Sequence, residues 1–269
     1  NFIASDITAV LAHTRDMYKM QDGEMAVVGK HDVSFYDENG QEIEKELFHV
    51  DWDVDAAEKG GYDHFMIKEI KEQPDALRKT IPPRITEDGH IKLDDLELTD
   101  EQIRSFDKVY IIGCGSAYHV GMIGKYVIEQ MTRIPVECDI ASEFRYRYPI
   151  LNEKTLTVII SQSGETADTL EALREAKRHG SRTLSIVNVV GSSIASESDD
   201  VLYTWAGPEI SVATTKAYST QLAMIYLLAI RLGLGNGTVS EALSQEYVAK
   251  LQELPDKVEK IFEQEDKIK

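Results

Sequence analysis

The segment Thr157-Val-Ile-Ile-Ser-Gln-Ser-Gly-Glu-Thr-Ala-Asp-Thr169 decides the fold. Its first four residues are typical of a buried strand, and the pattern then changes to a turn that is rich in hydroxyl groups and contains Gly164. A helix is expected from Ala167 to His179, with Gly180 placed to end it in the left-handed conformation. A strand that leads through a short turn into a helix is the repeating unit of a parallel α/β sheet.

Hydrogen-bonding side chains crowd this turn. The N-terminus of a helix presents unpaired backbone N–H groups and the positive end of the helix dipole, and both favour an anion such as phosphate. The simplest alternative is that Ser163 and Thr166 serve only as helix caps. The density of polar groups instead favours a phosphate ester with hydroxyls beside it, which is a sugar phosphate. The residues concerned are Ser161, Gln162, Ser163 and Thr166.

A second strand–turn–helix unit precedes this one. Residues 109–112 are predicted to form a buried strand, Gly113-Cys-Gly-Ser116 follows it, and apolar residues then recur at helical spacing. Two glycines after a strand also suggest dinucleotide binding, with Glu137 or Asp139 near the place of a ribose-binding carboxylate. Tyr118, however, stands where that motif requires a third glycine. A sugar phosphate therefore accounts for more of the pattern than a dinucleotide does.

Composition indicates a soluble cytoplasmic protein. The 269 residues are 42% hydrophobic, and their mean hydropathy is −0.29. The net charge of −18 argues against nucleic acid and anionic membranes as partners, because both attract basic proteins. The apolar run 225–232 is too short to span a bilayer. An acidic protein must recognise an anionic ligand locally, through helix N-termini and hydroxyl groups.

The two cysteines, Cys114 and Cys138, lack the spacing of metal ligands. Cys138 alternates with Val136 and Ile140 in a strand pattern, so we expect it in the core. Cys114 is interpreted as a small residue that fits the first turn, and a reactive thiol with a lowered pKa is the alternative. Neither a metal, a cofactor nor a disulfide is expected.

Four regions follow one another along the chain. Residues 1–53 carry β signals, and residues 54–63 are acidic, contain glycine and are predicted to be a linker. Residues 64–250 show the alternating pattern of an α/β domain, and residues 251–269 are expected to form a helical connector. The strands expected in this chain are 24–28, 33–36, 109–112, 136–140, 157–160, 184–189 and 201–204, the last five in a parallel sheet.

Two long helices are expected after the sheet. Residues 216–232 are apolar almost all round, which predicts a helix buried in the domain or in an interface. Residues 247–269 are predicted to form one charged helix with a single apolar face. The glycines expected to end the first helix are Gly233, Gly235 and Gly237, and the apolar face of the second comprises Leu251, Leu254, Val258 and Ile261.

The two turns resemble those of the first sugar isomerase (SIS) domain in the glutamine–fructose-6-phosphate aminotransferase family, also called the glucosamine-6-phosphate synthases. Further segments are similar to other parts of the same family. They match a late stretch of its glutaminase domain, the start of its isomerase half, the segment between the two turns and the loop before a long helix. These segments are 1–6, 68–74, 141–147 and 209–217.

The resemblance implies what the chain does. Family members make glucosamine-6-phosphate from fructose-6-phosphate and glutamine, and they are expected to be cytoplasmic homodimers. Residues 1–53 would be the C-terminal remnant of a glutaminase (class II amidotransferase) domain, and residues 64–250 the first SIS domain. The family's catalytic groups match no position here, so Lys216 and Lys269 are not given the imine-forming role and no catalytic residue is assigned. The chain alone is expected to bind fructose-6-phosphate or glucose-6-phosphate without turnover, and it would need the missing glutaminase half and second SIS domain.

The family's sugar-phosphate contacts can be carried over to single positions. The family usually reads Gly-Thr-Ser in the first turn, whereas this chain reads Gly115-Ser116-Ala117. If the missing hydroxyl touches the ligand, its loss should cost on the order of 1 kcal/mol of binding. The expected contacts are Gly115, Ser116, Ser161, Gln162, Ser163, Thr166 and the backbone of Val212.

Two other functions remain open. A noncatalytic SIS sensor of sugar phosphates would need an effector module, and no basic helix-turn-helix is present. A single-domain sugar-phosphate isomerase would complete its site across an oligomer, where His119 or Glu209 could serve. Segments 1–6 and 68–74 disfavour the isomerase. Otherwise His119 is expected to be a partly exposed helix residue, and Arg145 and Arg147 are expected to pair with carboxylates.

Overall fold

Two compact units, Asn1–Asp63 and His64–Lys269, make up the chain. The computed structural model describes residues 1–4, 10, 13–50, 59–93 and 96–268. The first half of the predicted linker, two residues of the segment 1–6, and Lys269 lie outside the described residues.

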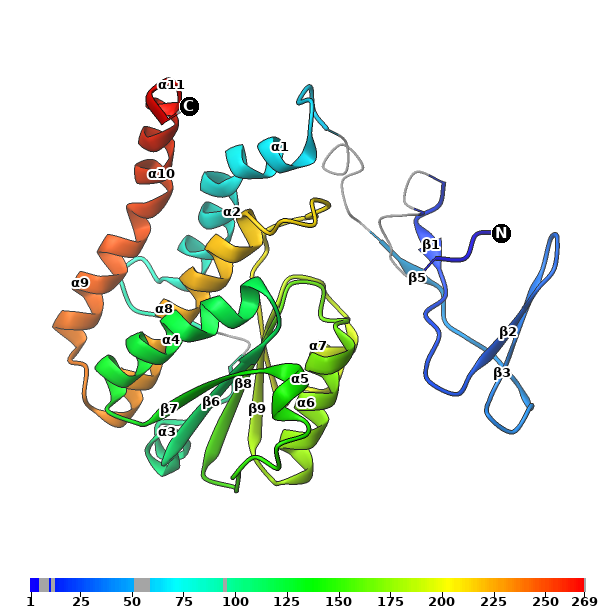
Figure 1. The fold of residues 1–269 in the computed structure, drawn as a ribbon, viewed down its shortest axis with the longest axis horizontal. Coiled ribbons are helices and arrows are strands. Elements are labelled where there is room, and N and C mark those ends of the chain that lie inside the picture. The colour runs from blue at the N-terminus through cyan, green and yellow to red at the C-terminus, as the bar shows by residue number, and fades with distance from the viewer. Residues whose placement is uncertain (5–9, 11–12, 51–58, 94–95, 269) are drawn as a thin grey trace. The chain divides into compact units, whose positions relative to one another are not determined.

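The first unit consists of short antiparallel strands (Figure 1). The two predicted strands are confirmed, and they pair with each other through a hairpin. The turn after the second of these strands closes with a hydrogen bond from the Gly40 N–H to the Asp37 carbonyl at 3.0 Å. Few of the unit's described apolar side chains are buried, Phe35 and Val50 among them. The strands are β1 (Asp16–Met17) paired with β5 (Phe48–His49), and β2 (Met25–Val28), β3 (Val33–Tyr36) and β4 (Glu42–Ile43) in order.

The second unit is built on a five-stranded sheet in which every neighbouring pair is parallel, as the alternating sequence pattern predicts (Figure 1). The order across the sheet is β10-β9-β8-β6-β7, which places β7 and β10 at the edges. The strands are β6 (Lys108–Gly113), β7 (Val136–Ile140), β8 (Thr155–Ser161), β9 (Arg182–Val187) and β10 (Asp200–Tyr203).

Both faces of this sheet are covered by helices, so its central strands β6, β8 and β9 are buried along almost their whole length. Ile111 of β6 and Ile160 of β8 belong to the core on one face, while Tyr110 and Ile159 belong to the core on the other. Helices α4 (Ser116–Thr132) and α8 (Lys216–Asn236) cover the first face (Figure 1). Helices α5 (Ala141–Phe144), α6 (Ala167–Arg178) and α7 (Ser193–Glu197) cover the second.

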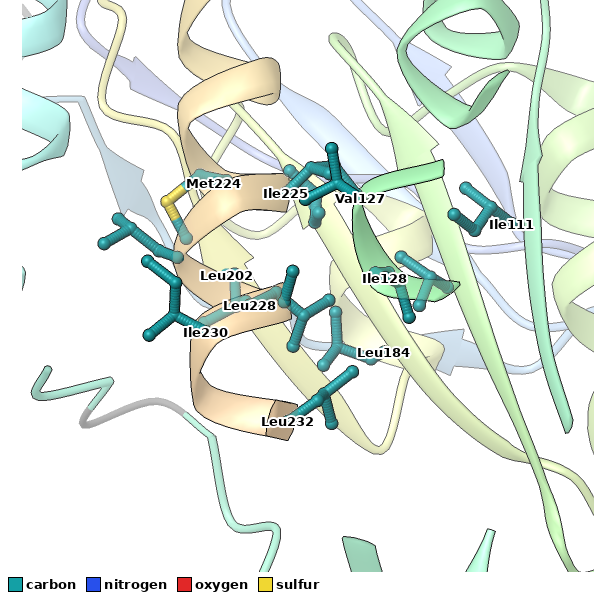
Figure 2. Close-up of a cluster of buried hydrophobic side chains, with 14 of the residues drawn as sticks. Ile111, Val127, Ile128, Leu184, Leu202, Met224, Ile225, Leu228, Ile230 and Leu232 are labelled. Atoms are coloured by element: carbon teal, nitrogen blue, oxygen red, sulfur yellow. The ribbon is translucent and has the colours of Figure 1, made fainter. Parts of the chain in front are cut away.

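Helix α8 is the central helix of the larger core. Figure 2 shows its side chains Ile225 and Leu228 beside Val127 and Ile128 of α4. By length and composition α8 could cross a membrane, yet 67% of its most apolar window is buried inside the protein.

The prediction that Gly233 and Gly235 end α8 is wrong. The helix continues to Asn236, and only Gly237, with a φ of +81°, takes the left-handed conformation that closes it. The two inner glycines allow close packing instead. A Cβ at Gly233 would lie 2.5 Å from Val239, and one at Gly235 would lie 2.6 Å from Ile103.

The prediction of one helix over residues 247–269 is also wrong, because three helices occupy the region from Glu241 onward. Ser240 caps the first by accepting a hydrogen bond from the Leu243 N–H at 3.3 Å. Pro255 lies in the first turn of the second, where its missing N–H costs no helical hydrogen bond. The helices are α9 (Glu241–Gln252), α10 (Leu254–Phe262) and α11 (Glu265–Ile268).

Shorter helices precede the sheet in the second unit. Thr99 and Gln102 form a reciprocal capping box at the start of α3. Arg78 of α2 joins this region to α10 through hydrogen bonds to Asp256 at 2.8 Å and Glu259 at 2.7 Å. The elements are α1 (Phe65–Lys71), α2 (Gln73–Thr80), the 3-10 helix η3 (Pro82–Arg84) and α3 (Asp100–Ser105).

Candidate binding site

A cavity of about 150 Å³ lies at the carboxyl ends of β6 and β8. These two strands are neighbours although β7 lies between them in the sequence, because the sheet grows outward from β6 in one direction and from β8 in the other. Open α/β sheets bind their ligands at such a switch in strand order. The topology alone therefore selects this place for a site.

Three parts of the chain line the cavity. The turn after β6 and the start of α4 form one wall, the turn after β8 with the start of α6 forms a second, and the start of α8 with its preceding loop forms the third. All of the side chains are uncharged. The lining residues are Cys114, Ser116, Ala117, Ile160, Ser161, Gln162, Ser163, Thr166, Thr169, Thr214 and Gln221.

The turn after β8 is held by its own hydroxyl groups. Ser161 Oγ accepts a hydrogen bond from the Gly164 N–H at 3.0 Å and lies 3.3 Å from Thr166 Oγ1. Ser163 Oγ accepts one from the Glu165 N–H at 3.2 Å. Gly164 has a φ of +68°, and a Cβ there would lie 2.1 Å from Ser192 Oγ. The chain can make this tight turn only because residue 164 is glycine.

The two helices that follow the hydroxyl-rich turns, α4 and α6, have no side-chain cap. Gly115 precedes α4 with a φ of +55°, and Thr166 precedes α6 without a capping hydrogen bond from its side chain. By contrast, Thr99 caps α3 and Ser240 caps α9. Thr166 therefore occupies the N-cap position of α6, but its side chain makes no capping hydrogen bond. The Ala117 N–H of α4 donates to the Cys114 carbonyl at 3.1 Å, and the other unpaired N–H groups at the starts of α4 and α6 are placed to meet an anion in the cavity.

The two arginines of the segment between the turns are paired with carboxylates. Arg145 contacts Asp168 at 2.9 Å, and Arg147 contacts Asp139 at 2.6 Å and Glu137 at 3.3 Å, as expected of two arginines in an acidic chain. Burial acts to raise the pKa of Glu137, but hydrogen bonds from Lys108 and Tyr110 outweigh it and lower the pKa. The two carboxylates that a dinucleotide site would use are thus engaged in ion pairs.

The loop before α8 completes the cavity through Thr214. Val212 is fully exposed and is absent from the lining, whereas Thr214 two residues later belongs to it. Glu209 holds the end of this loop by accepting hydrogen bonds from the N–H groups of Thr215 at 2.9 Å and Ala217 at 3.2 Å. Burial raises the pKa of the Glu209 carboxyl, against the effect of those two bonds.

The predicted contacts thus fall into two groups. Ser116, Ser161, Gln162, Ser163 and Thr166 share one cavity, while Gly115 is an exposed N-cap at its margin. The polar residues that α6, α8 and the loop before α8 supply to the cavity were not predicted from the sequence. Gln221 carried a signal, since it is a polar residue in an otherwise apolar stretch; Thr214, Thr169 and Gln221 are the polar side chains missed.

Three other residues considered in the sequence lie as follows. His119 is an exposed residue of α4, as expected. Lys216 is buried at the start of α8 and contacts Glu72 at 2.7 Å, away from the cavity lining. Cys114 lines the cavity and accepts a weak hydrogen bond from the Thr169 hydroxyl at 3.6 Å.

Cys138 is half-buried rather than a core residue, because β7 is an edge strand. It lines a second cavity of about 230 Å³ beside α4, and burial raises the pKa of its thiol to about 11. Among the described residues, no cluster of three or more His, Cys, Asp or Glu side chains could hold a metal ion.

The chain is similar to a known domain family and to known enzymes. Residues 102–231 match the SIS domain family. Glutamine–fructose-6-phosphate aminotransferases from Caldanaerobacter subterraneus subsp. tengcongensis and Clostridium tetani are 56% and 54% identical over 268 residues. These matches cover 100% of the chain, and the chain spans 44% of the length of either relative.

Two solved structures of sugar-phosphate proteins have a fold similar to that of this chain. The C-terminal domain of glucosamine-fructose-6-phosphate aminotransferase from Francisella tularensis superposes with a TM-score of 0.70 at 38% identity, over 74% of this chain and 56% of that one. Glucosamine-6-phosphate deaminase from Thermotoga maritima superposes with a TM-score of 0.55 at 26% identity, over 72% of this chain and 55% of that one.

The sheet topology, the hydroxyl-rich turns and the matched residues define a SIS-domain protein. Within that class, the similarity along the whole chain shows that it belongs to the glutamine–fructose-6-phosphate aminotransferase family, of whose members it corresponds to a part.

Proposed function

We propose that the cavity binds a hexose 6-phosphate, with the phosphate in the turn after β8. One observation carries the proposal: two uncapped helix N-termini and several hydroxyl side chains converge on one uncharged cavity. Backbone N–H groups and helix dipoles attract an anion without a cationic side chain. In a chain with a net charge of −18, this local arrangement is what allows an anionic ligand to bind.

For the longer protein we propose glutamine–fructose-6-phosphate aminotransferase activity, which yields glucosamine-6-phosphate. The identity of 56% over the whole chain supports it. In this proposal residues 1–53 are the end of a glutaminase domain, 54–63 a linker, 64–250 the first SIS domain and 251–269 a connector. The remaining glutaminase half and a second SIS domain are the partners, in a cytoplasmic homodimer.

The role of this chain in that reaction is to bind and orient. An amine condenses with the ketone of the open-chain ketose, and a proton shift converts the ketose imine into an aldose amine. The proposed contacts are Gly115, Ser116, Ser161, Gln162, Ser163 and Thr166, with Val212 at the loop that closes the site. They would fix the phosphate end of the sugar, and no residue here is proposed to move the proton.

Calorimetric titration tests the binding proposal. The chain is titrated with fructose-6-phosphate and with glucose-6-phosphate, and the titrations are repeated on Ser163→Ala. Loss of a hydrogen bond to a charged group costs about 1.5–3 kcal/mol, so affinity should fall about tenfold or more. Ser105→Ala, at an exposed position at the end of α3, is the matched control and should bind like the unaltered chain.

Two results would count against the proposal. A folded chain that binds neither sugar phosphate contradicts the assignment of the site. Production of glucosamine-6-phosphate by the chain alone contradicts the limited role proposed for it.

A further inference from the structure

Gln221 is a buried polar residue whose side-chain oxygen has no hydrogen-bond partner among the described residues. It lies in the second turn of α8, its exposed fraction is 1%, and it lines the cavity. The residues that follow it, Ala223, Met224 and Ile225, are buried and apolar. A leucine would suit this position without leaving an oxygen unsatisfied, so packing does not account for a glutamine here.

The unpaired side-chain oxygen of Gln221 restricts which ligand groups can bind to it. An amide oxygen accepts hydrogen bonds only, and its ligand must therefore bring a donor. A phosphate dianion has acceptors but no donor, and the N–H groups of α4 and α6 already provide for it. A sugar hydroxyl is a donor. Gln221 also comes from a different wall of the cavity than the turn Ser161–Thr166.

We propose that Gln221 determines specificity by accepting a hydrogen bond from a hydroxyl of the sugar. Through this contact the site distinguishes a hexose 6-phosphate from phosphate alone. The inference rests on the proposed function, because it assigns the sugar end of the same ligand. Thr214, on the loop before α8, lines the same cavity, and its hydroxyl offers a second polar contact to the sugar.

The test compares two ligands on matched variants. Gln221→Leu removes the acceptor at nearly constant volume, and Gln221→Met does the same while keeping an unbranched side chain. Gln252→Leu, at an exposed position at the end of α9, is the control for the substitution itself. Dissociation constants are measured for fructose-6-phosphate and for inorganic phosphate by ligand-observed NMR, and thermal unfolding is recorded for each variant.

Either Gln221 variant should weaken fructose-6-phosphate binding about tenfold and change phosphate binding by less than about twofold. The unfolding midpoint should stay the same or rise, because the buried unsatisfied amide is gone. Equal weakening of both ligands, or no weakening in a folded Leu or Met variant, overturns the assignment of Gln221 and leaves the proposed function intact. If the unaltered chain binds neither ligand, the proposed function and this inference fail together.

Discussion

Glu69 of α1 accepts a hydrogen bond from the backbone N–H of Ile210 at 2.7 Å. The same carboxylate oxygen accepts a second one from the N–H of Ser211 at 3.0 Å. Glu69 is only 2% exposed, so these charge-assisted bonds form away from water. Helix α1 thereby fixes the loop that brings Thr214 to the cavity.

Removing this carboxylate should loosen the loop. Glu69→Leu leaves two N–H groups without an acceptor and should lower the free energy of unfolding by about 3 kcal/mol. We expect weaker binding of fructose-6-phosphate and faster proteolysis within residues 207–215. Glu69→Gln keeps one acceptor oxygen and should fall between the unaltered chain and the leucine variant. A leucine variant whose loop is as resistant as before would show that α1 does not hold it.

The turn after β8 should tolerate no side chain at Gly164. Gly164 and Gly180 both have positive φ values, +68° and +77°, but only at Gly164 would a Cβ meet other atoms. Gly180→Ala should therefore cost about 1 kcal/mol of unfolding free energy, from backbone strain alone. Gly164→Ala adds the overlap with Ser192 and should cost about 3 kcal/mol. Urea unfolding of the two variants measures the difference, and equal losses would show that the contact with Ser192 relaxes freely.

The Glu209 carboxyl should make stability depend on pH. Burial raises its pKa above the ordinary value of 4.5, so the folded protein holds this proton more tightly than the unfolded chain does. The stabilisation is complete below pH 4.5 and is lost as the pH rises through the folded pKa. Glu209→Gln does not titrate, and its amide oxygen can still accept a hydrogen bond from Thr215.

Urea unfolding from about pH 4 to about pH 8 checks this sign. The stability of the unaltered chain relative to Glu209→Gln should fall as the pH rises through that window. A relative stability that increases with pH would mean that the N–H groups of Thr215 and Ala217 dominate over burial.

The sheet could be predicted from the sequence because its strands are local apolar runs. Residues 109–112 and 157–160 are buried on both sides, and such runs with helices between them indicate parallel strands. The ends of the helices were harder to predict from the sequence. Gly233 and Gly235 carry the local signal of a helix end, yet the approach of Val239 and Ile103, which no local pattern reveals, is what requires them.

Some residues of the candidate site could likewise be predicted from the local sequence, and others could not. Ser161 and Thr166 lie in one short turn, so their proximity follows from the local sequence. Gln221 reaches the cavity only because α8 packs across α4, and that contact joins elements about a hundred residues apart. Val212 shows the converse, since a loop residue assigned by resemblance lies fully exposed while Thr214 lines the cavity.

Two arginine–carboxylate pairs should differ in their effect on stability. Arg182 binds both carboxylate oxygens of Asp200, at 2.8 Å and 3.1 Å, and the side chain of Asp200 is 0% exposed. Arg182→Met would leave that buried charge without its cation, so the free energy of unfolding should fall by about 3 kcal/mol. Arg178 makes a similar pair with Glu175, but its side chain is 60% exposed. Arg178→Met should therefore cost less than about 1 kcal/mol. Urea unfolding measures both variants, and similar losses would show that burial of Asp200 does not set the strength of its pair.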